Sequence, residues 1–600
     1  MIENREWLVT DRTGGFAMGT ASGVRTRKYH GFYQRIASRG RWSGLADLDL
    51  ALDGVGLWPH RYRGGANDVA PAKFLEGAAP EWSWAQPGGW LTFRVSPAPG
   101  EGIRLAWNWR SRRGASGGRH RLEIRPFFAC RDLHGLGGAE WTLQGTGSRV
   151  HRVGPLRISE SGVPAHWHRQ PLWFEDFFYG EEERRGYPAV ERLFSEGVWE
   201  VPLAPGQDSF ELLVEFDRHR DAVEPLASIE SRVADFMLID PPGICAGFPW
   251  FGEWGRDSFI ALPGIVSAHL LERPGDGSIW NWAEGLLEEW GRWIESDGML
   301  PNVLGPSGEP QWESCDATLW WIHSLAALWS IALRDPKREE AFRVRFAGML
   351  QAGIDSIERD RHRHLRLLEN GLLEVSGGFT TWMDARIGDR PVTPRVGVLP
   401  EIQALWFQAL VLAHLWKVRQ IPREELARLA AAALSASHEH DRPNRVFLHS
   451  IPLAPSFVFG LEAELRRDWE VIAGDFLVPV GLRTLRRSSQ GYCPSYFGDQ
   501  ETRDRAYHQG TVWPWLGGHA EMAHARLPGD RPGPACPGLS GEMDSLIPGH
   551  LPELADGDQP HRYRGAPAQA WSLACREEFR FRERFALDSG LRSVLSFSGL

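Results

Sequence analysis

Two acidic residues of this 600-residue chain lie in windows of residue types that bind sugar. Asp384 follows Trp382 in residues 381–385, and Glu553 lies in the loop-like stretch 551–558. Hydrolysis of a glycosidic bond needs one carboxylic acid to protonate the leaving oxygen and a second carboxylate on the opposite face of the sugar. Trp rings stack on the C–H faces of sugars, while Asp, Arg, His and Gln bind hydroxyl groups. The pair therefore indicates a glycoside hydrolase.

The two carboxylates need different surroundings for these roles. A general acid needs a raised pKa, which an apolar aromatic wall beside Asp384 provides by disfavouring the charged form. An N-cap of a following helix is an equally good reading, and Arg386 nearby would lower the pKa instead. Glu553, on an exposed polar loop, is expected to stay ionised and hold a water as general base. Its alternative is an ordinary solvated surface glutamate.

An Arg–Asp pair, Arg256 and Asp257, lies in the Gly- and Pro-rich loop 246–258. Such a pair can bind several hydroxyls of one sugar, because Arg donates and Asp accepts hydrogen bonds. Trp254 in the same loop adds an indole. The alternative is structural, with Asp257 capping a helix that begins at Ser258.

Three further windows combine polar and aromatic residues at expected helix starts or loops. Asp316 precedes a predicted helix, either as a binding group or as its N-cap. His508 and Trp513 lie in the loop 507–515, and Gln569 with Trp571 opens another helix. We expect these side chains to lie around the same site as the two carboxylates.

The bulk properties exclude several other classes. The chain is 42% hydrophobic with a net charge of −10, and its basic residues are scattered, which argues against nucleic acid as a partner. No secretion signal and no run of about 18 apolar residues appears, so we expect a cytoplasmic protein without membrane contact. The six cysteines have no Cys-x-x-Cys spacing and are expected to be reduced. No phosphate loop, dinucleotide fingerprint or zinc helix is present, so no cofactor or metal is expected.

The apolar pattern changes period along the chain. Up to about residue 220 it alternates, as at Leu91, Phe93 and Val95, which predicts an antiparallel β-sandwich. A connecting helix is expected from Ala222 to Leu238. Beyond it the apolar residues recur every three or four positions, as in 279–293, 319–329 and 402–416. The predicted domains are 1–220 (β-sandwich), 221–240 (helical linker) and 241–600 (helical, a toroid of paired helices by its length).

Together these windows resemble the bacterial glycogen-debranching, amylo-α-1,6-glucosidase family. The resemblance is carried, in order, by residues 6–31, 182–186, 254–257, 381–385, 510–515 and 569–572. It implies a β-sandwich followed by an (α/α)6 barrel and inverting removal of single α-1,6-linked glucose residues. It also implies Asp384 as general acid and Glu553 as general base. Arg256 and Asp257 would hold the terminal glucose of an α-glucan, and the helix-start residues would line the pocket.

The chain departs from the family pattern in two places near the expected base. The segment 527–541 is rich in Pro and Gly, and the tail after Cys575 is unusually basic. Three alternatives stay open: an exo-α-glucosidase for α-1,4 linkages or disaccharides, an inverting phosphorylase, and a glucan-binding protein without turnover. Only the last is supported by these departures. Neither the oligomeric state nor the preferred glucan length follows from the sequence.

Overall fold

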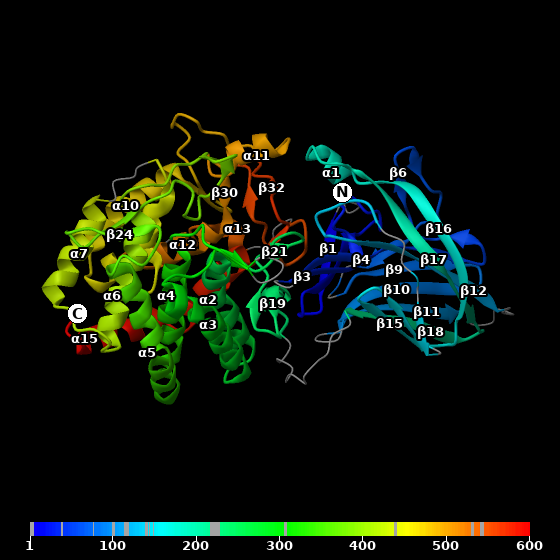
Figure 1. The fold of residues 1–600 in the computed structure, drawn as a ribbon, viewed down its shortest axis with the longest axis horizontal. Helices are drawn as coiled ribbons and strands as arrows, with labels where there is room; N and C mark the ends of the chain where they lie inside the picture. Colours follow the sequence, from blue (N-terminus) through cyan, green and yellow to red (C-terminus); the bar gives the residue numbers. More distant parts are fainter. Residues whose placement is uncertain are drawn as a thin grey trace.

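The computed structural model describes residues 5–37, 40–75, 77, 79–98, 102–112, 119–138, 142, 144–147, 149–216, 229–304, 309–436, 441–529, 533–540 and 545–600. An N-terminal half built from antiparallel sheets is followed by a helical half, and the two lie side by side (Figure 1). The change of apolar period near residue 220 thus predicts the change of architecture correctly.

The described strands of the N-terminal half form two large antiparallel sheets. In the first, the order is β1 (Glu6–Thr10), β2 (Gly15–Thr20), β3 (Gly31–Ala37), β4 (Gly40–Leu52), β12 (His120–Arg131), β17 (Val190–Leu203), β16 (His166–Phe178), β6 (Arg61–Tyr62) and β7 (Gly65–Ala66), with β5 (Val55–Gly56) on β4. In the second it is β13 (Gln144–Gly147), β14 (Val150–Val153), β15 (Leu156–Gly162), β18 (Gln207–Phe216), β11 (Gly102–Ser111), β10 (Gly89–Ala98), β9 (Glu81–Gln86) and β8 (Lys73–Leu75).

Alternation explains how these sheets pack. Leu91, Phe93 and Val95 on β10 are fully buried, as are Leu105 and Trp107 opposite them on β11. Side chains from both sheets share one hydrophobic cluster. Successive residues of a strand point to opposite faces, so the alternating apolar residues form the side that is removed from water.

The connecting helix predicted for 222–238 is wrong where the structure describes it. Residues 222–228 lie outside the described residues. From there the chain forms a 3-10 helix, Arg232–Phe236, and then β19 (Met237–Leu238), which pairs with β20 (Gly243–Ile244). Val233, Ala234 and Phe236 are buried in the core of the helical half, so tertiary packing overrides the local helical pattern.

The helices of the second half separate into buried and amphipathic ones. Those buried nearly all round are α2 (Gly255–Glu272), α4 (Ala317–Ala332), α6 (Pro400–Leu415) and α12 (Pro514–Ala525). Those buried mainly on one face include α3 (Ser278–Asp297), α5 (Pro336–Glu358), α7 (Arg423–Ala436), α10 (Glu462–Asp475) and α15 (Leu587–Phe597). A helix that is apolar all round belongs inside, and an amphipathic one outside.

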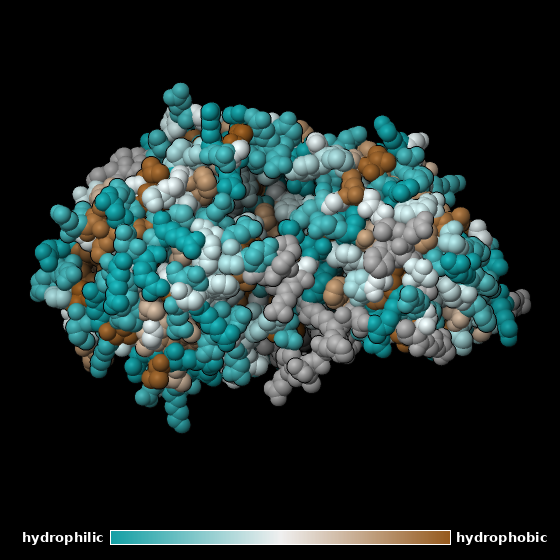
Figure 2. Space-filling view, viewed as in Figure 1, coloured by the Kyte–Doolittle hydropathy of each residue, from teal (hydrophilic) through white to brown (hydrophobic). Residues whose placement is uncertain are grey.

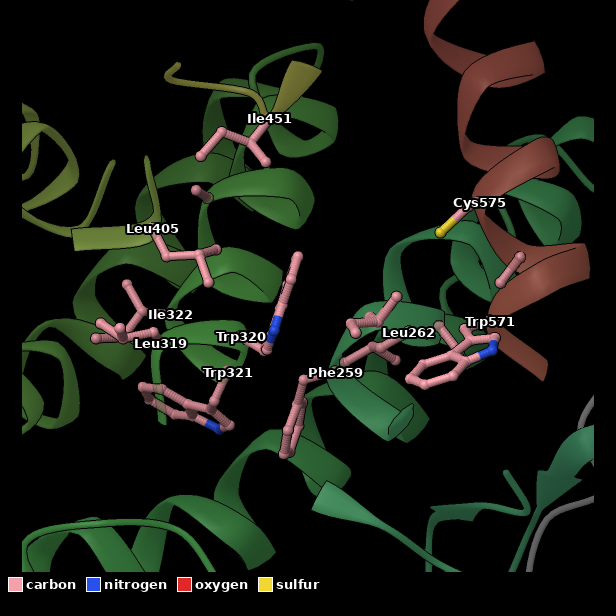
Figure 3. Packing of buried hydrophobic residues seen from close by; sticks show 14 of the residues in the cluster. Phe259, Leu262, Leu319, Trp320, Trp321, Ile322, Leu405, Ile451, Trp571 and Cys575 are labelled. Carbon is pink, nitrogen blue, oxygen red and sulfur yellow. The ribbon is translucent and has the colours of Figure 1, made fainter. Parts of the chain in front are cut away.

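The inner helices contact one another in sequence. Helix α2 packs on α4, α4 on α6, α6 on the short α8 (Phe447–Ser450), α8 on α12, α12 on α14 (Ala570–Arg584), and α14 returns to α2. Figure 3 shows side chains of α2, α4, α6 and α14 in this packing, among them Phe259, Trp320, Leu405 and Trp571. The remaining helices are α1 (Gly180–Arg184), α9 (Pro455–Val458), α11 (Gln500–Ala506) and α13 (Pro537–Ser540).

Short strands and loops lie at one end of these helices. The strands are β28 (Leu477–Val478), β29 (Gly481–Arg483), β30 (Val512–Trp513), β31 (Leu554–Ala555) and β32 (Tyr563–Arg564), in one small sheet. Another pair, β21 (Gly247–Phe248) and β33 (Ala568–Gln569), joins the start of the helical half to its end. Residues 533–540, within the Pro- and Gly-rich stretch, contain α13. The basic tail forms part of α14, where Arg576 and Arg580 pair with Glu577.

The two halves are joined by backbone and core contacts. The Glu6 amide donates to the Leu546 carbonyl at 2.9 Å, and the Ile239 amide donates to that of Arg12 at 2.8 Å. Phe16 of the sheet region also belongs to the core of the helical half. The halves therefore present a joint surface.

Candidate active site

The predicted site residues come together where several inner helices begin. Arg256 and Asp257 lie in the first turn of α2, Asp316 directly precedes α4, and Gln569 directly precedes α14. Asp384 lies in the loop before β26 (Arg386–Ile387). Helix N-termini carry a partial positive charge from aligned peptide dipoles, which favours carboxylates at this end.

Arg256 organises one side of the site. It is buried, and its Nε donates to Asp316 at 2.7 Å while Nη1 donates to Asp384 at 3.0 Å. Its Nη2 donates to the Ser314 hydroxyl at 3.3 Å and the Thr380 carbonyl at 3.2 Å. The guanidinium therefore fixes two carboxylates that are far apart in the chain.

Asp384 has the more exposed side chain of the two carboxylates that Arg256 holds. Its side chain is 34% exposed, whereas that of Arg256 is 3% exposed. Burial of the carboxyl raises its pKa, although the adjacent Arg256 charge and hydrogen bond oppose this. The alternative of an N-cap is wrong, because the described chain continues from Asp384 into a strand. Arg386, the neighbour suspected from sequence, pairs with Glu313 instead.

The pKa of Asp257 is raised by burial and by the charges of both predicted catalytic carboxylates. Burial raises its pKa to about 7, Arg256 opposes the rise, and the charges of Asp384 and Glu553 reinforce it. The amide of Gln569 donates to its Oδ1 at 3.2 Å. Asp257 does not cap α2, because the helix begins at Gly255, two residues earlier. Asp316, at the N-cap of α4, makes no capping hydrogen bond with its side chain.

Glu553 is buried, with 2% of its surface exposed. The expectations of an exposed loop and of a solvated surface glutamate are both wrong. The Tyr507 hydroxyl donates to Oε1, and the backbone amide of Ala566 donates to Oε2 at 2.8 Å. Burial raises the pKa of Glu553 to about 7; the two hydrogen bonds lower it and the Asp384 charge raises it further. The local composition is typical of an exposed loop, but Tyr507 and the chain around Gly565 lie against the Glu553 carboxylate.

Four of the predicted aromatic residues of the site pack against one another. Trp382, His508 and Trp513 are at most 1% exposed. The His508 ring stacks on Trp513 at 5.1 Å and meets the Trp382 ring edge-on at 5.4 Å. Trp571 packs on Trp513 at 5.8 Å. Burial lowers the pKa of His508 well below its ordinary value, so its ring is neutral.

Trp254 lies apart from this aromatic group. It is half-buried at the N-cap of α2 and lines a cavity of about 620 Å³ between the halves, together with Trp250 and Tyr29. Its ring meets Phe251 edge-on at 6.5 Å.

The sequence reading missed Tyr507 and Gly565. Tyr507 is adjacent to His508, and its place in an aromatic window was the available signal. Gly565 has a φ of +69°, and a Cβ built there would lie 2.2 Å from Glu553 Oε2. A glycine 12 residues from an acid gives no sequence signal for such a contact.

Within the described residues, no group of three or more His, Cys, Asp or Glu side chains is arranged to hold a metal ion. The six cysteines, all in described segments, form no disulfide. Each helix of the described part is too short or too polar to cross a bilayer.

Asp384 and Glu553 both have a raised pKa and are held by Arg256 and Tyr507 respectively. Such a pair of carboxyl groups is suited to acid–base cleavage of a glycoside. The enzyme class is thus a glycoside hydrolase. The chain belongs to the amylo-alpha-1,6-glucosidase family: the model of that description matches residues 233–577. The model described as the glycogen debranching enzyme N terminal matches residues 5–210. The protein is a glycogen-debranching glycoside hydrolase of the amylo-α-1,6-glucosidase type.

Among solved structures, the chain is similar to a polysaccharide lyase at 10% sequence identity. The match covers 95% of this chain and 99% of the lyase chain, with a TM-score of 0.32.

Proposed function

We propose that the protein releases single α-1,6-linked glucose residues from glycogen or limit dextrin by inverting hydrolysis, with Asp384 as general acid and Glu553 as general base. The observation that carries this is the gathering of the two carboxyls around Asp257: Arg256, the residue before it, donates to Asp384 at 3.0 Å, and the pKa of Asp257, raised by burial, is raised further by the charges of both Asp384 and Glu553. A carboxyl pair at one site is what cleavage of a glycosidic bond requires.

The acid step rests on the partial exposure of Asp384. As the most open carboxyl of the arginine network, it reaches a bound substrate while burial favours its protonated form. Its proton goes to the glycosidic oxygen as the C1–O bond breaks, and the glucan chain leaves as an alcohol. Arg256 holds the carboxyl and stabilises the carboxylate that remains.

The base step rests on the fixed carboxylate of Glu553. Each of its oxygens accepts one hydrogen bond, from Tyr507 and from the Ala566 amide, which leaves further lone pairs for a water. Glu553 takes a proton from that water as the oxygen attacks C1 from the side opposite the leaving group. Inverting enzymes hold the two carboxyls roughly 6.5–9.5 Å apart to leave room for the water.

The terminal glucose is assigned to the polar groups around the pair. Arg256, Asp257, Asp316 and Gln569 bind its hydroxyls in this proposal. Five aromatic residues are also assigned to substrate binding. Four of them pack together and shape the pocket: Trp382, His508, Trp513 and Trp571. The fifth, Trp254, lies toward the sheet half.

We further propose that the helical half is an (α/α)6 barrel and the sheet half a β-sandwich. The closed order of contacts from α2 through α14 back to α2 supports the first, and the shared core of the two sheets supports the second. The proposed sheet and helical domains remain 1–220 and 241–600. The described part of the stretch 221–240 is not a helical linker, because Arg232–Phe236 is a 3-10 helix that packs in the core of the helical half.

The test is glucose release from phosphorylase-limit dextrin carrying single-glucose stubs. We expect Asp384→Asn and Glu553→Gln each to lose activity by at least about 10²–10⁴-fold, the usual contribution of a general acid or base. Asp389→Asn, an exposed acid nearby, is the matched control and should retain activity. Proton NMR of the first product should show β-glucose; α-glucose would refute inversion. Hydrolysis of maltose but not of the stubs would refute the linkage.

A further inference from the structure

A cavity of about 900 Å³ lies between the two halves of the molecule. In Figure 1, α1 of the sheet half faces α11 and β32 of the helical half, and Figure 2 shows the surface hollowed in this region. Its walls include Arg185 from the sheet half and Trp250, Tyr496, Phe497 and Arg562 from the helical half. A cavity of this size accommodates a ligand much larger than one sugar.

One wall of this cavity is shared with the proposed base. Gly565 lines the cavity, and its backbone lies directly against the Glu553 carboxylate. Tyr496 lines it too, and its ring packs on Tyr507 at 5.5 Å. The cavity is therefore adjacent to the candidate active site.

The sheet half contributes Arg185 to the wall of this cavity. This residue follows α1, and its carbonyl accepts a hydrogen bond of 2.9 Å from Arg503 on α11. Its guanidinium lies 4.4 Å from the Trp250 ring centroid, a cation–π contact. Its Nη1 is buried and makes no hydrogen bond to any described residue. Burial raises the pKa of Glu553, and the Arg185 charge is among the groups that oppose this rise.

Two other arginines of the cavity already form ion pairs. Arg27 pairs with Glu6 at 2.6 Å, and Arg564 pairs with Asp556 at 2.8 Å. Among the described residues, Arg562 forms no ion pair and its side chain is exposed. Donors without acceptors in a hollow are suited to hydroxyl oxygens of a ligand.

Phe497 adds an aromatic surface to the same cavity. It is 48% exposed, one of the few large apolar side chains of the described part that are. The Arg564 guanidinium lies 5.5 Å from its ring centroid. An exposed aromatic within a hollow lined by arginines suits the C–H face of a sugar ring, because it pairs apolar stacking with hydroxyl binding.

We propose that this cavity binds the α-1,4-linked chain that carries the branch glucose, with Arg185 and Phe497 as its principal contacts. The proposal rests on the proposed function. A single-glucose branch sits within a chain that continues in both directions, so the chain must lie on an open surface beside the pocket for the glucose. The cavity has the place, the size and the mixture of donors and aromatic rings for it.

The first experiment is calorimetric titration of maltoheptaose into the Asp384→Asn protein. Adding Phe497→Ala or Arg185→Gln should weaken binding at least about tenfold each, the effect of losing one charge-assisted hydrogen bond or a comparable contact. Trp90→Ala, which removes a 42% exposed aromatic outside the cavity, should not change it. Unchanged affinity in either cavity variant overturns the proposal. So does binding of inorganic phosphate, lost in Arg185→Gln, without binding of maltoheptaose.

The second experiment compares two substrates in the otherwise unaltered enzyme. Limit dextrin offers the branch-bearing chain, and isomaltose offers only the linkage. The ratio of kcat/KM for dextrin to that for isomaltose should fall about tenfold in Phe497→Ala, mainly through KM, and stay constant in Trp90→Ala. A constant ratio in Phe497→Ala overturns the cavity assignment alone. A wild type that cleaves neither substrate refutes the proposed function, while the titration still decides the cavity.

Discussion

Replacing Tyr507 with phenylalanine removes one hydroxyl, the donor to Glu553 Oε1, and keeps the ring that packs on Trp513 at 5.0 Å. That hydrogen bond favours the ionised form of Glu553 and lowers its pKa. A hydrogen bond to a charged group contributes about 1.5–3 kcal/mol. One pKa unit corresponds to about 1.4 kcal/mol. The pKa of Glu553, raised by burial to about 7, should therefore rise by a further one to two units, roughly.

The sign of the effect on activity follows from the role of the base. Glu553 must be ionised to accept a proton, so kcat/KM rises as pH increases through its pKa. At pH 7 the ionised fraction should fall from about one half to between about one tenth and one hundredth, a loss of roughly 5- to 50-fold. The loss should diminish as the pH is raised.

The assay is glucose release from stub-bearing limit dextrin between pH 5 and 9, with the low-pH limb of kcat/KM fitted for each variant. Tyr492→Phe is the matched control, because the Tyr492 hydroxyl donates to a different carboxylate, Asp558, at 3.0 Å. A low-pH limb that does not move in Tyr507→Phe, or that moves equally in the control, would refute the assignment of Glu553 as the base.

Two more predictions concern geometry and stability. Gly565→Ala should reduce kcat about 100-fold, because the added Cβ would lie 2.2 Å from Glu553 Oε2 and displace a reacting group by about 1 Å. Gly491→Ala has a similar positive φ and no atom within 4 Å, so it shares the backbone strain and should keep its activity. Equal losses in both would mean that strain alone is responsible. Glu6→Gln should lower thermal stability at neutral pH. Burial raises the pKa of Glu6, but the Arg27 charge and the His30 hydrogen bond outweigh it and lower the value from 4.5 to about 2. A depressed carboxyl pKa stabilises the fold above pH 4.5, here by about 3 kcal/mol, and the contribution is lost as pH falls toward 2. Unfolding temperatures that differ equally at pH 7 and pH 3 would contradict this.

The sequence predicts the fold where its pattern is long enough to repeat. Leu91, Phe93 and Val95 alternate within a ten-residue strand, and residues 279–293 repeat at helical spacing within α3. The strands β28 to β32 have only two or three residues each, which is too short for an alternating apolar pattern to be recognised in the sequence. The segment 229–238 carries helical spacing but is drawn into the core as a 3-10 turn and a strand.

At the site, the residue types predict the kind of chemistry, but they do not predict the tertiary contacts of each side chain. The sequence alone draws attention to the windows around Asp384 and Glu553. The raised pKa expected for Asp384 agrees with its burial, but the exposed surroundings expected for Glu553 are wrong. The partner of Asp384 is Arg256, 128 residues earlier, and not its neighbour Arg386. Glu553 is covered by Tyr507, 46 residues earlier. A carboxyl pKa depends on such tertiary contacts, and spacing along the chain does not encode them.

The pairing of β21 with β33 has a consequence for how the enzyme is made. Asp257 receives its hydrogen bond from Gln569, 312 residues later, and α14 packs directly on α2. A growing chain on the ribosome can complete its sheet half and most helices before these last elements emerge. Until then α2 lacks its neighbour, and the apolar surface that α14 will cover faces water. The nascent protein therefore passes through a stage in which this apolar surface is uncovered, and Asp257 gains its hydrogen bond from Gln569 only after the last elements have docked.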